Sequence, residues 1–383
     1  MPTQGALNGV TVLDLSRLLP GPFCSMILAD HGARVIAIED KKQYAADGLF
    51  VPTVQRNKQH MTLDLKTPEG QEIFFRLAAT ADVIIEGFRP GVVERLGVDY
   101  DRVRRVKPDI VYCSISGYGQ NGPYAQRVGH DVNYLGYAGV LDLMGAPDRP
   151  PSIPGIQIAD IAAGGMNGAI GILLALFARQ RTGEGQRIDI SMSDGMLAML
   201  PVAQFWQAFS GQAPQRGDNL LAHRYACYNT YATADGRHIA VGALEGRFWQ
   251  RLCGEVGMAH YADLQFDETR RREIIQAFQD VFLKKSLAEW EAALGGLDLC
   301  VSPIRTLPEA LDSALFRERQ MVLEVDRPDG TTETTLGVAV KMSATPGSVR
   351  TPSAQFGQHT REILEEIGYS PEQIRQLEVQ NVI

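Results

Sequence analysis

The stretch VTVLDLSRLLPGPFCSMILADHGARVIAIED, residues 10–40, decides the fold class of this chain. Its apolar runs at 10–16 and 33–40 have the length and composition of buried strands. Residues 20–32 between them carry prolines near their start and a glycine at their end, as a helix does. Two strands joined by a helical crossover pair in parallel, so the stretch predicts an α/β fold.

The same alternation continues to about residue 190, and it predicts a doubly wound, mainly parallel sheet. Further elements are expected as a helix at 67–81, strands at 82–88 and 109–117, and a long helix at 156–180 that begins close to Asp160. We therefore expect a large α/β domain over residues 1–224.

The pattern changes at about residue 225. Asp235-Gly236 lies between two alternating runs, which indicates a β-hairpin. Helical patterns follow around 245–257, 270–283 and 286–294. We expect a smaller α+β domain at 225–330, after which the helical tail, 331–383, returns to the first domain.

Composition narrows the classes of function. The formal net charge of the 383 residues is -8, which argues against nonspecific binding of nucleic acid. The five cysteines are scattered without metal-ligand spacing, so we expect a reducing compartment and no metal. No signal peptide is recognisable, and the apolar stretch 166–178 is shorter than the roughly 20 residues that cross a bilayer. A cytoplasmic protein without a membrane or nucleic-acid partner is expected.

Several basic residues follow predicted strands, where α/β proteins gather their ligands. Lys66, Arg89 and Arg95, together with Arg56 and Lys58, are candidates for a phosphate-binding rim that holds a nucleotide-like cofactor. Solvated charges at helix starts are the competing interpretation. The glycines in GYGQNG, 117–122, resemble a dinucleotide fingerprint, but Pro123 follows at once and the expected acidic residue is missing. A structural turn is the better interpretation of that motif.

Three residues, His130, Asp160 and Glu245, have the chemistry of an acid–base site. His130 and Asp131 lie in RVGHDVNYLGYAGVLDLMG, 127–145, among aromatic residues and glycines. Asp160 lies between apolar residues, where burial would raise its pKa, and Glu245 follows an apolar strand. A core histidine, a helix N-cap and a carboxylate favoured by a helix dipole are the respective alternatives.

The chain resembles family III coenzyme A transferases, and within them the α-methylacyl-CoA racemase branch, over nearly its whole length. The resemblance is carried by VLDLSRLLPGPFCSMILADHGARVI, RNKQHMTLDLKTPEG, EGFRPGVVERLG, SGYGQNGP, GHDVNYLGYAG, RTGEGQRIDISMSDG and YATADGRHIAVGALE. It implies that His130 and Asp160 are the catalytic pair of a racemase and that Glu245 orients the histidine. In the transferases, the position of Asp160 is the nucleophile.

The resemblance also implies where coenzyme A binds. The matching positions in the large domain are Leu63, Asp64, Leu65, Lys66, Glu86, Gly87, Phe88, Arg95, Gly129, Asp131, Asn133 and Tyr134. Asp40 replaces an arginine that members often carry after the second strand, and Lys41 or Lys42 could substitute for it. The family fold further implies an interlocked homodimer, with coenzyme A entering as part of an acyl-CoA substrate and no covalently bound cofactor.

Two chemistries remain in competition. A racemase would exchange the α-proton of a 2-methyl-branched acyl-CoA between His130 and Asp160, whereas a transferase would form an acyl and then a CoA intermediate on Asp160. Residues 217–231 lack the glycine run that transferases commonly carry, which favours the racemase. Gly246 stands where racemases usually have proline, and the C-terminal tail is more similar to transferases. An inactive acyl-CoA-binding protein is disfavoured because the trio is intact. Met192, Met196 and Met199 are either core residues or an acyl-binding surface.

Overall fold

The computed structural model describes residues 5–41 and 51–383, and its internal contacts divide the chain into two compact units. Unit 1 comprises Met1–Val140, Pro154–Leu200 and Ala314–Ile383, and unit 2 comprises Leu141–Ile153 and Pro201–Ser313. The second unit therefore has other bounds than the predicted second domain, 225–330: its main segment begins at Pro201 and ends at Ser313. Lys42, named above as a substitute for an arginine, lies outside the described residues.

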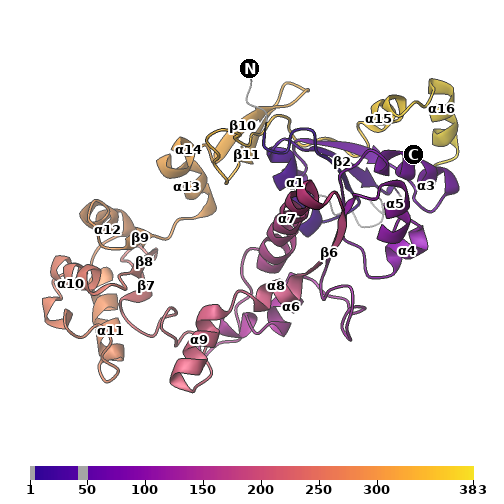
Figure 1. Ribbon diagram of the computed structural model, residues 1–383. Coiled ribbons are helices and arrows are strands. Elements are labelled where there is room, and N and C mark those ends of the chain that lie inside the picture. Colours follow the sequence, from indigo (N-terminus) through magenta and orange to yellow (C-terminus); the bar gives the residue numbers. More distant parts are fainter. Residues whose placement is uncertain (1–4, 42–50) are drawn as a thin grey trace. The chain divides into compact units, whose positions relative to one another are not determined.

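Unit 1 is built on a six-stranded sheet in the order β3-β2-β1-β4-β5-β6, and all of its neighbouring strands are parallel. This confirms the predicted doubly wound α/β architecture (Figure 1). The four strands expected from the sequence are present, and β3 and β6 were not expected. The strands are β1 (Thr11–Asp14), β2 (Arg34–Glu39), β3 (Lys58–Thr62), β4 (Val83–Glu86), β5 (Val111–Ser116) and β6 (Gln186–Ser191).

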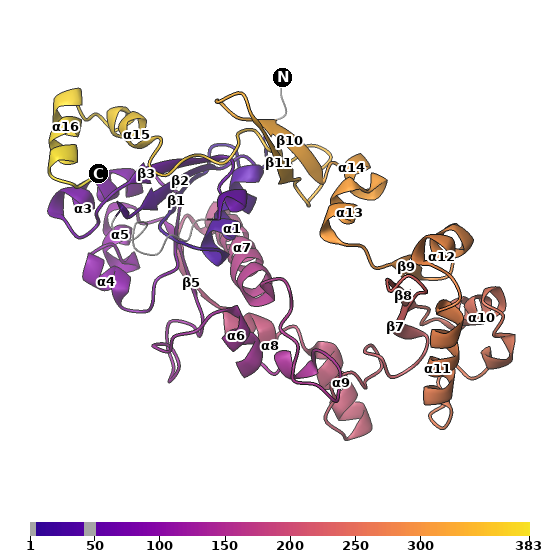
Figure 2. The same ribbon diagram turned by 180° about the vertical axis from the view of Figure 1, so that it is seen from behind.

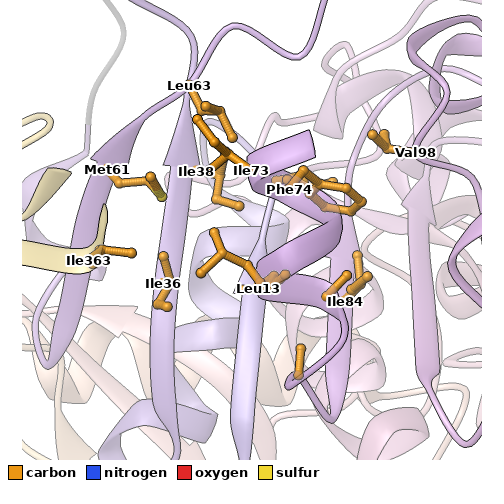
Figure 3. Packing of buried hydrophobic residues seen from close by; sticks show 14 of the residues in the cluster. Leu13, Ile36, Ile38, Met61, Leu63, Ile73, Phe74, Ile84, Val98 and Ile363 are labelled. Atoms are coloured by element: carbon orange, nitrogen blue, oxygen red, sulfur yellow. The ribbon is translucent and has the colours of Figure 1, made fainter. Parts of the chain in front are cut away.

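Helices cover both faces of this sheet because successive strand residues point to opposite sides. Val12 packs in one buried cluster with residues of α1 (Pro20–Asp30) and α7 (Asn167–Thr182). Leu13 packs in a second cluster, and Figure 3 shows it near Ile73 and Phe74 of α3 (Pro68–Ala78). The second cluster also includes residues of α5 (Tyr100–Val106), α15 (Thr360–Glu366) and α16 (Pro371–Val379).

The long helix expected at 156–180 is present in two parts. A π-helical segment, η3 (Ala159–Met166), runs directly into α7. Together they form a helix of 24 residues that contains an 18-residue window with a mean hydropathy of 1.9, so the expectation of a segment too short to cross a bilayer is wrong on length. One side of α7 packs against the sheet and α1, as a core helix does. Its other side exposes apolar side chains, among them Leu174 and Phe177.

The hairpin β10 (Val322–Asp326) and β11 (Thr332–Leu336) belongs to unit 1, although the expected second domain extended to residue 330. The physical reason is Arg56, which is buried and donates to the Thr335 hydroxyl at 3.1 Å and to the Leu336 carbonyl. The other short elements of unit 1 are α4 (Val92–Leu96), α6 (Asp131–Tyr137), α8 (Met192–Leu197) and α14 (Ala314–Glu318).

Unit 2 has its own core around a three-stranded antiparallel sheet in the order β7-β8-β9. The predicted hairpin is confirmed, with Gly236 at a φ of 72° in the turn. Figure 2 shows the helices that surround this sheet. The elements are α9 (Pro201–Ser210), β7 (Tyr228–Ala232), β8 (His238–Gly242), α10 (Gly246–Glu255), α11 (Arg271–Phe282), α12 (Leu287–Leu294), β9 (Val301–Pro303) and α13 (Leu307–Asp312).

Candidate active site

A cavity of about 860 Å³ opens at the carboxyl ends of the parallel strands in unit 1. Its walls come from the segments that follow β1 to β5, together with η3 and the start of α8. This is the edge where α/β sheets bind ligands, because the loops that leave the strands meet there. Among the described residues, every one that lines the cavity belongs to unit 1.

His130 and Asp160 both line this cavity, although they come from different elements. His130 is exposed and caps α6, where its main-chain N–H donates to Oδ1 of Asn133 at 3.0 Å and its carbonyl accepts from the Asn133 N–H at 2.8 Å. Asp160 is half-buried in the first turn of η3. An imidazole and a carboxyl group therefore share one solvent-accessible hollow.

The backbone at Asp160 is held by its neighbour in the cavity wall. The main-chain N–H of Asp160 donates to Oδ1 of Asp131 at 3.0 Å, and Asp131 is buried. Asp131 thus connects the start of α6 to the start of η3, instead of lining the cavity itself. The family resemblance assigned it to coenzyme A; its observed contact is with the main chain of η3.

The pKa of Asp160 is raised to about 6. Burial is the largest cause, the negative charge of Asp131 adds to it, and His130 opposes it. A carboxyl group with such a pKa changes its protonation state close to neutral pH. It is therefore suited to give and take a proton under ordinary conditions.

Small residues let η3 lie directly against helix α1. A Cβ on Gly165 would approach Cδ1 of Phe23 to 2.7 Å and the Pro20 carbonyl oxygen to 3.0 Å. A Cβ on Gly164 would approach Cβ of Pro20 to 2.8 Å. Glycine is required at both positions for this spacing, which fixes the depth of the segment that carries Asp160. π-Helical turns of this kind are rare and often lie at functional sites.

Most residues that the resemblance assigned to coenzyme A line the same cavity. They are Leu63, Asp64, Leu65, Lys66, Gly87, Phe88, Gly129, Asn133 and Tyr134. Arg95 is exposed on α4 and Glu86 is buried behind the wall, so these two lie outside the lining. Arg89, proposed from its position after a strand, does line the cavity.

Glu86 supports the wall from behind. Its Oε2 accepts a hydrogen bond of 2.8 Å from the main-chain N–H of Phe88, which lines the cavity. Burial raises the pKa of Glu86 to about 7, against the lowering effects of the nearby Ser114 and of the hydrogen bond from the Phe88 N–H. A buried carboxyl group at the end of β4 thus fixes the turn that follows this strand.

Glu245 belongs to unit 2, where it is exposed and precedes the first residue of α10. Its carbonyl accepts from the N–H groups of Phe248 and Trp249 at 2.9 and 3.1 Å. This position agrees with the alternative interpretation of a carboxylate at a helix N-terminus. Its expected role beside His130 remains a prediction.

Two of the five basic residues proposed for a phosphate-binding rim, Arg56 and Lys58, form contacts in the buried interior instead. The prediction is wrong for these two residues. The Arg56 side chain pairs with Asp30 at 2.7 Å in the buried interior. Lys58 donates to the Pro22 carbonyl at 2.8 Å, and its Nζ lies 3.6 Å from Oδ2 of Asp14. Burial lowers the pKa of this lysine.

Arg17 and Arg127 line the cavity and were missed in the sequence. Arg17 lies over the Phe88 ring, with 5.6 Å between its Cζ and the ring centroid. Arg127 lies 4.1 Å over the ring of Tyr124 and donates to the Tyr137 hydroxyl at 2.6 Å. Arg17 follows β1, so the strand-end rule that selected Lys66 and Arg89 would have found it too.

The arrangement is suited to an anionic ligand that undergoes proton or acyl transfer. Guanidinium groups at the rim bind phosphate oxygens, and the His130–Asp160 pair supplies an acid and a base. Within residues 5–41 and 51–383, no group of three His, Cys, Asp or Glu side chains could hold a metal ion. The GYGQNG glycines form turns, with Gly119 and Gly122 at positive φ, and no helix follows them directly.

The comparisons with known proteins agree on one family. The model of CoA-transferase family III matches residues 7–360. An alpha-methylacyl-CoA racemase from Homo sapiens is 38% identical over 379 residues, which cover 99% of this chain and 97% of the relative. A succinyl-CoA--D-citramalate CoA-transferase from Chloroflexus aurantiacus is 33% identical over 395 residues, with 98% of each chain covered.

A solved structure supports the same conclusion. The crystal structure of a CAIB/BAIF family protein from Brucella suis matches with a TM-score of 0.82 and 29% sequence identity. The match covers 95% of this chain and 100% of that one. Sequence and fold therefore point to the same group of enzymes.

Proposed function

This chain belongs to CoA-transferase family III, and from that membership we propose that it interconverts the R and S epimers of 2-methyl-branched acyl-CoA thioesters. The family makes it a CoA-utilising enzyme. The observation that carries the finer proposal is that His130 and Asp160 line one cavity, with the pKa of Asp160 raised to about 6.

In the proposed reaction, the neutral imidazole of His130 takes the proton from the carbon next to the thioester. The electron pair of the broken C–H bond moves into an enolate, and the protonated carboxyl group of Asp160 returns a proton to the opposite face. The roles reverse for the other epimer. The main-chain N–H groups of Asp131 and Val132, at the start of α6, have no acceptor within the helix, and they would stabilise the enolate oxygen.

Two further parts of the proposal come from the family resemblance. Glu245 would accept a hydrogen bond from the His130 imidazole and so fix its tautomer. The active molecule would be an interlocked homodimer. The exposed apolar side of α7, which includes Leu174 at 65% and Phe177 at 59% exposure, is the kind of surface that a subunit interface covers.

The second candidate is CoA transfer between carboxylic acids. The observation in its favour is that relatives named as CoA-transferases match the chain at 30–34% identity over at least 94% of its length. In this reaction the Asp160 carboxylate attacks the thioester carbonyl and expels CoA thiolate, which leaves an anhydride. The thiolate then attacks the Asp160 carbonyl, the free acid leaves, and the resulting enzyme–CoA thioester transfers CoA to a second acid.

The test incubates the protein in deuterium oxide with one epimer of a 2-methylacyl-CoA and an isotopically labelled free acid. A racemase yields α-deuterated thioester of both configurations and no labelled thioester. A transferase yields labelled thioester without α-exchange, and that outcome would overturn the proposal.

Two variants separate the roles of the side chains. We expect His130→Ala to lower the exchange rate by about a hundredfold or more, because general-base catalysis contributes roughly 10²–10⁴-fold. His238→Ala, an exposed histidine of unit 2, should leave the rate unchanged. Undiminished exchange in His130→Ala would show that the imidazole is not the base.

A further inference from the structure

Leu18 has a left-handed backbone conformation on the wall of the candidate active site. Its φ is 64°, and its side chain lines the cavity and is 39% exposed. A left-handed backbone brings the Cβ of an L-residue close to the following carbonyl oxygen, so branched side chains rarely adopt it. Strain of this kind persists where the surrounding structure enforces it, and it is concentrated at functional sites. A contact with the ligand would give a physical reason for a leucine at this position.

Hydrogen bonds on both sides of Leu18 hold its loop in place. Before Leu18, the main-chain N–H of Ser16 donates to Oδ1 of Asp14 at 2.9 Å, and the Ser16 hydroxyl donates to the same oxygen. After Leu18, the N–H of Phe23 donates to the Leu19 carbonyl at 2.9 Å, where α1 begins. The loop therefore presents the Leu18 side chain to the cavity from a fixed backbone.

The loop of Leu18 lies beside the segment that carries Asp160. Pro20, two residues after Leu18, packs against η3, where a Cβ on Gly164 would come within 2.8 Å of its Cβ and a Cβ on Gly165 within 3.0 Å of its carbonyl oxygen. Asp160 precedes these glycines by four and five residues, which is about one turn of a π-helix. Asp160 and the two glycines therefore share one side of η3, and that side faces the loop of Leu18.

Leu18 offers more free surface than the other apolar side chains beside η3 that line the cavity. Ile115 and Met192 belong to the same wall, and Sδ of Met192 would lie 3.1 Å from a Cβ on Gly164. These two side chains are only 2% and 5% exposed, and Pro20 is half-buried. An apolar group that enters this part of the cavity therefore makes its main contact with Leu18.

We propose that Leu18 contacts the branch on the α-carbon of the acyl group and limits its size, so that a methyl group is accepted and a longer branch is not. The proposal rests on the proposed function, since it needs an acyl-CoA whose α-carbon lies between His130 and Asp160. The main acyl chain is long and must leave this region, whereas the branch ends beside the reacting carbon. A residue next to the acid therefore constrains the branch more than the chain.

The physical basis of the selection is apolar contact at a position that cannot yield. A methyl group against Leu18 loses apolar surface to water and gains dispersion contacts. A longer branch would meet a side chain whose backbone is fixed by the hydrogen bonds of Ser16 and Phe23. Leu18 is thus a specificity-determining residue for the size of the α-branch.

The experiment measures kcat/KM for α-proton exchange in deuterium oxide with 2-methyloctanoyl-CoA and 2-ethyloctanoyl-CoA. The wild-type protein should prefer the methyl-branched thioester about tenfold or more, which is the effect of one methylene group in a tight apolar site. Leu18→Ala, which shortens the side chain, should reduce this preference to about threefold or less. Leu18→Gly should give the same reduction, and Leu18→Met, which keeps most of the volume, should retain the preference.

Two variants outside the cavity lining are the matched controls. Leu315→Ala truncates an exposed leucine of α14, and Gln320→Gly replaces an exposed residue with a left-handed φ of 54°. Both should keep the wild-type preference, which separates the effect of Leu18 from those of a lost apolar side chain or a relaxed backbone elsewhere.

A preference that is unchanged in Leu18→Ala would overturn the proposal. A change confined to Leu18→Gly would also overturn it, because the backbone and not the side chain would then select the branch. Exchange in the wild type without any preference between the two thioesters would refute the assignment of Leu18 alone. Transfer of CoA to a free acid without α-exchange would instead refute the proposed function.

Discussion

Asp131 accepts a hydrogen bond from the main-chain N–H of Asp160, with 3.0 Å between Oδ1 and the nitrogen. The same carboxylate contributes to the raised pKa of the Asp160 side chain, after burial as the larger cause. One residue thus fixes the position of the candidate acid and also sets its protonation. These two effects can be separated, because an asparagine keeps the acceptor oxygen and removes the charge.

Asp131→Asn should lower the pKa of Asp160 from about 6, since the repelling negative charge is gone. In the direction in which His130 is the base, Asp160 must be protonated, so the alkaline limb of the rate profile should move to lower pH. At a pH above this alkaline limb, a shift of the limb by one pH unit lowers the rate about tenfold. The measurement is the pH dependence of α-proton exchange from each epimer, with Asp101→Asn, which removes an exposed carboxylate of α5, as the charge control.

The reverse direction provides the internal check. In that direction the Asp160 carboxylate is the base. The acidic limb of the rate profile should therefore also move to lower pH, and the rate below pH 6 should rise. Limbs that move in opposite directions, or that stay in place, would show that Asp131 does not control the protonation of Asp160.

Glu86 should make the stability of unit 1 depend on pH. Its folded pKa of about 7 lies above the ordinary value of 4.5, so the folded state keeps a proton that the unfolded chain has lost. The stabilisation from this proton is therefore complete below about pH 4.5 and is lost as the pH rises to about 7. Glu86→Gln should gain stability relative to the wild type over this window, by up to about 3 kcal/mol.

Unfolding by urea, followed by far-UV circular dichroism at pH 5 and pH 8, measures this difference. The glutamine side chain of the Glu86→Gln variant retains an oxygen that accepts from the Phe88 N–H, so the turn itself should persist. Glu69→Gln, an exposed position on α3, is the matched control. An equal stability difference at both pH values would contradict the assigned titration.

Gly165→Ala should destabilise the protein by about 1–3 kcal/mol, as overpacking of a dense interior does. The new Cβ would meet Phe23 at 2.7 Å and force η3 away from α1. Because Asp160 lies on η3, we expect a loss of turnover that exceeds any change in KM. Gly254→Ala is the control: this helical glycine has no atom within 4 Å of the added Cβ, so it should be neutral or stabilising by up to about 1 kcal/mol. Equal thermal stability of the two variants would contradict the close packing of η3.

The strands with continuous apolar runs could be predicted from the sequence, but the ranges of β3 and β6 could not. β3 reads KQHMT, and its Lys58 and His60 are buried because acidic partners on distant segments meet them. β6 is a largely exposed edge strand and therefore lacks an apolar signal. Local patterns carry no information about such distant partners or about edge position.

The same limit explains which site residues were predicted correctly. Lys66 and Arg89 were proposed as residues that follow strands, although no range was predicted for the strand before Lys66, and both line the cavity. Arg56 and Lys58 look equivalent in the sequence, yet Asp30 and Asp14 neutralise them in the interior. A basic side chain is available to a ligand only if no acidic side chain pairs with it in the folded protein. The spacing of residues along the chain does not show such pairs.

The contact between His359 and β3 gives the last prediction. Nδ1 of His359 accepts from the main-chain N–H of His60 at 3.0 Å, so this ring nitrogen must be unprotonated. The His359 main-chain N–H in turn donates to the His60 carbonyl at 2.8 Å, and the Thr62 N–H donates to the Thr360 hydroxyl at 3.0 Å. These bonds attach the start of α15 to the edge of the sheet, where the two elements lie side by side (Figure 2).

Burial lowers the pKa of His359 below 6.5; Glu362 opposes this effect and His60 adds to it. A histidine with a lowered folded pKa stabilises the fold above the unfolded pKa, and that stability is lost as the pH falls through the folded value. His359→Ala should therefore cost about 1 kcal/mol at pH 7.5 and progressively less in acid. His359→Asn keeps an acceptor that does not titrate, so in acid it should be more stable than the wild type. Parallel pH profiles of the wild type and His359→Asn in urea unfolding would show that the attachment of α15 does not depend on an unprotonated His359.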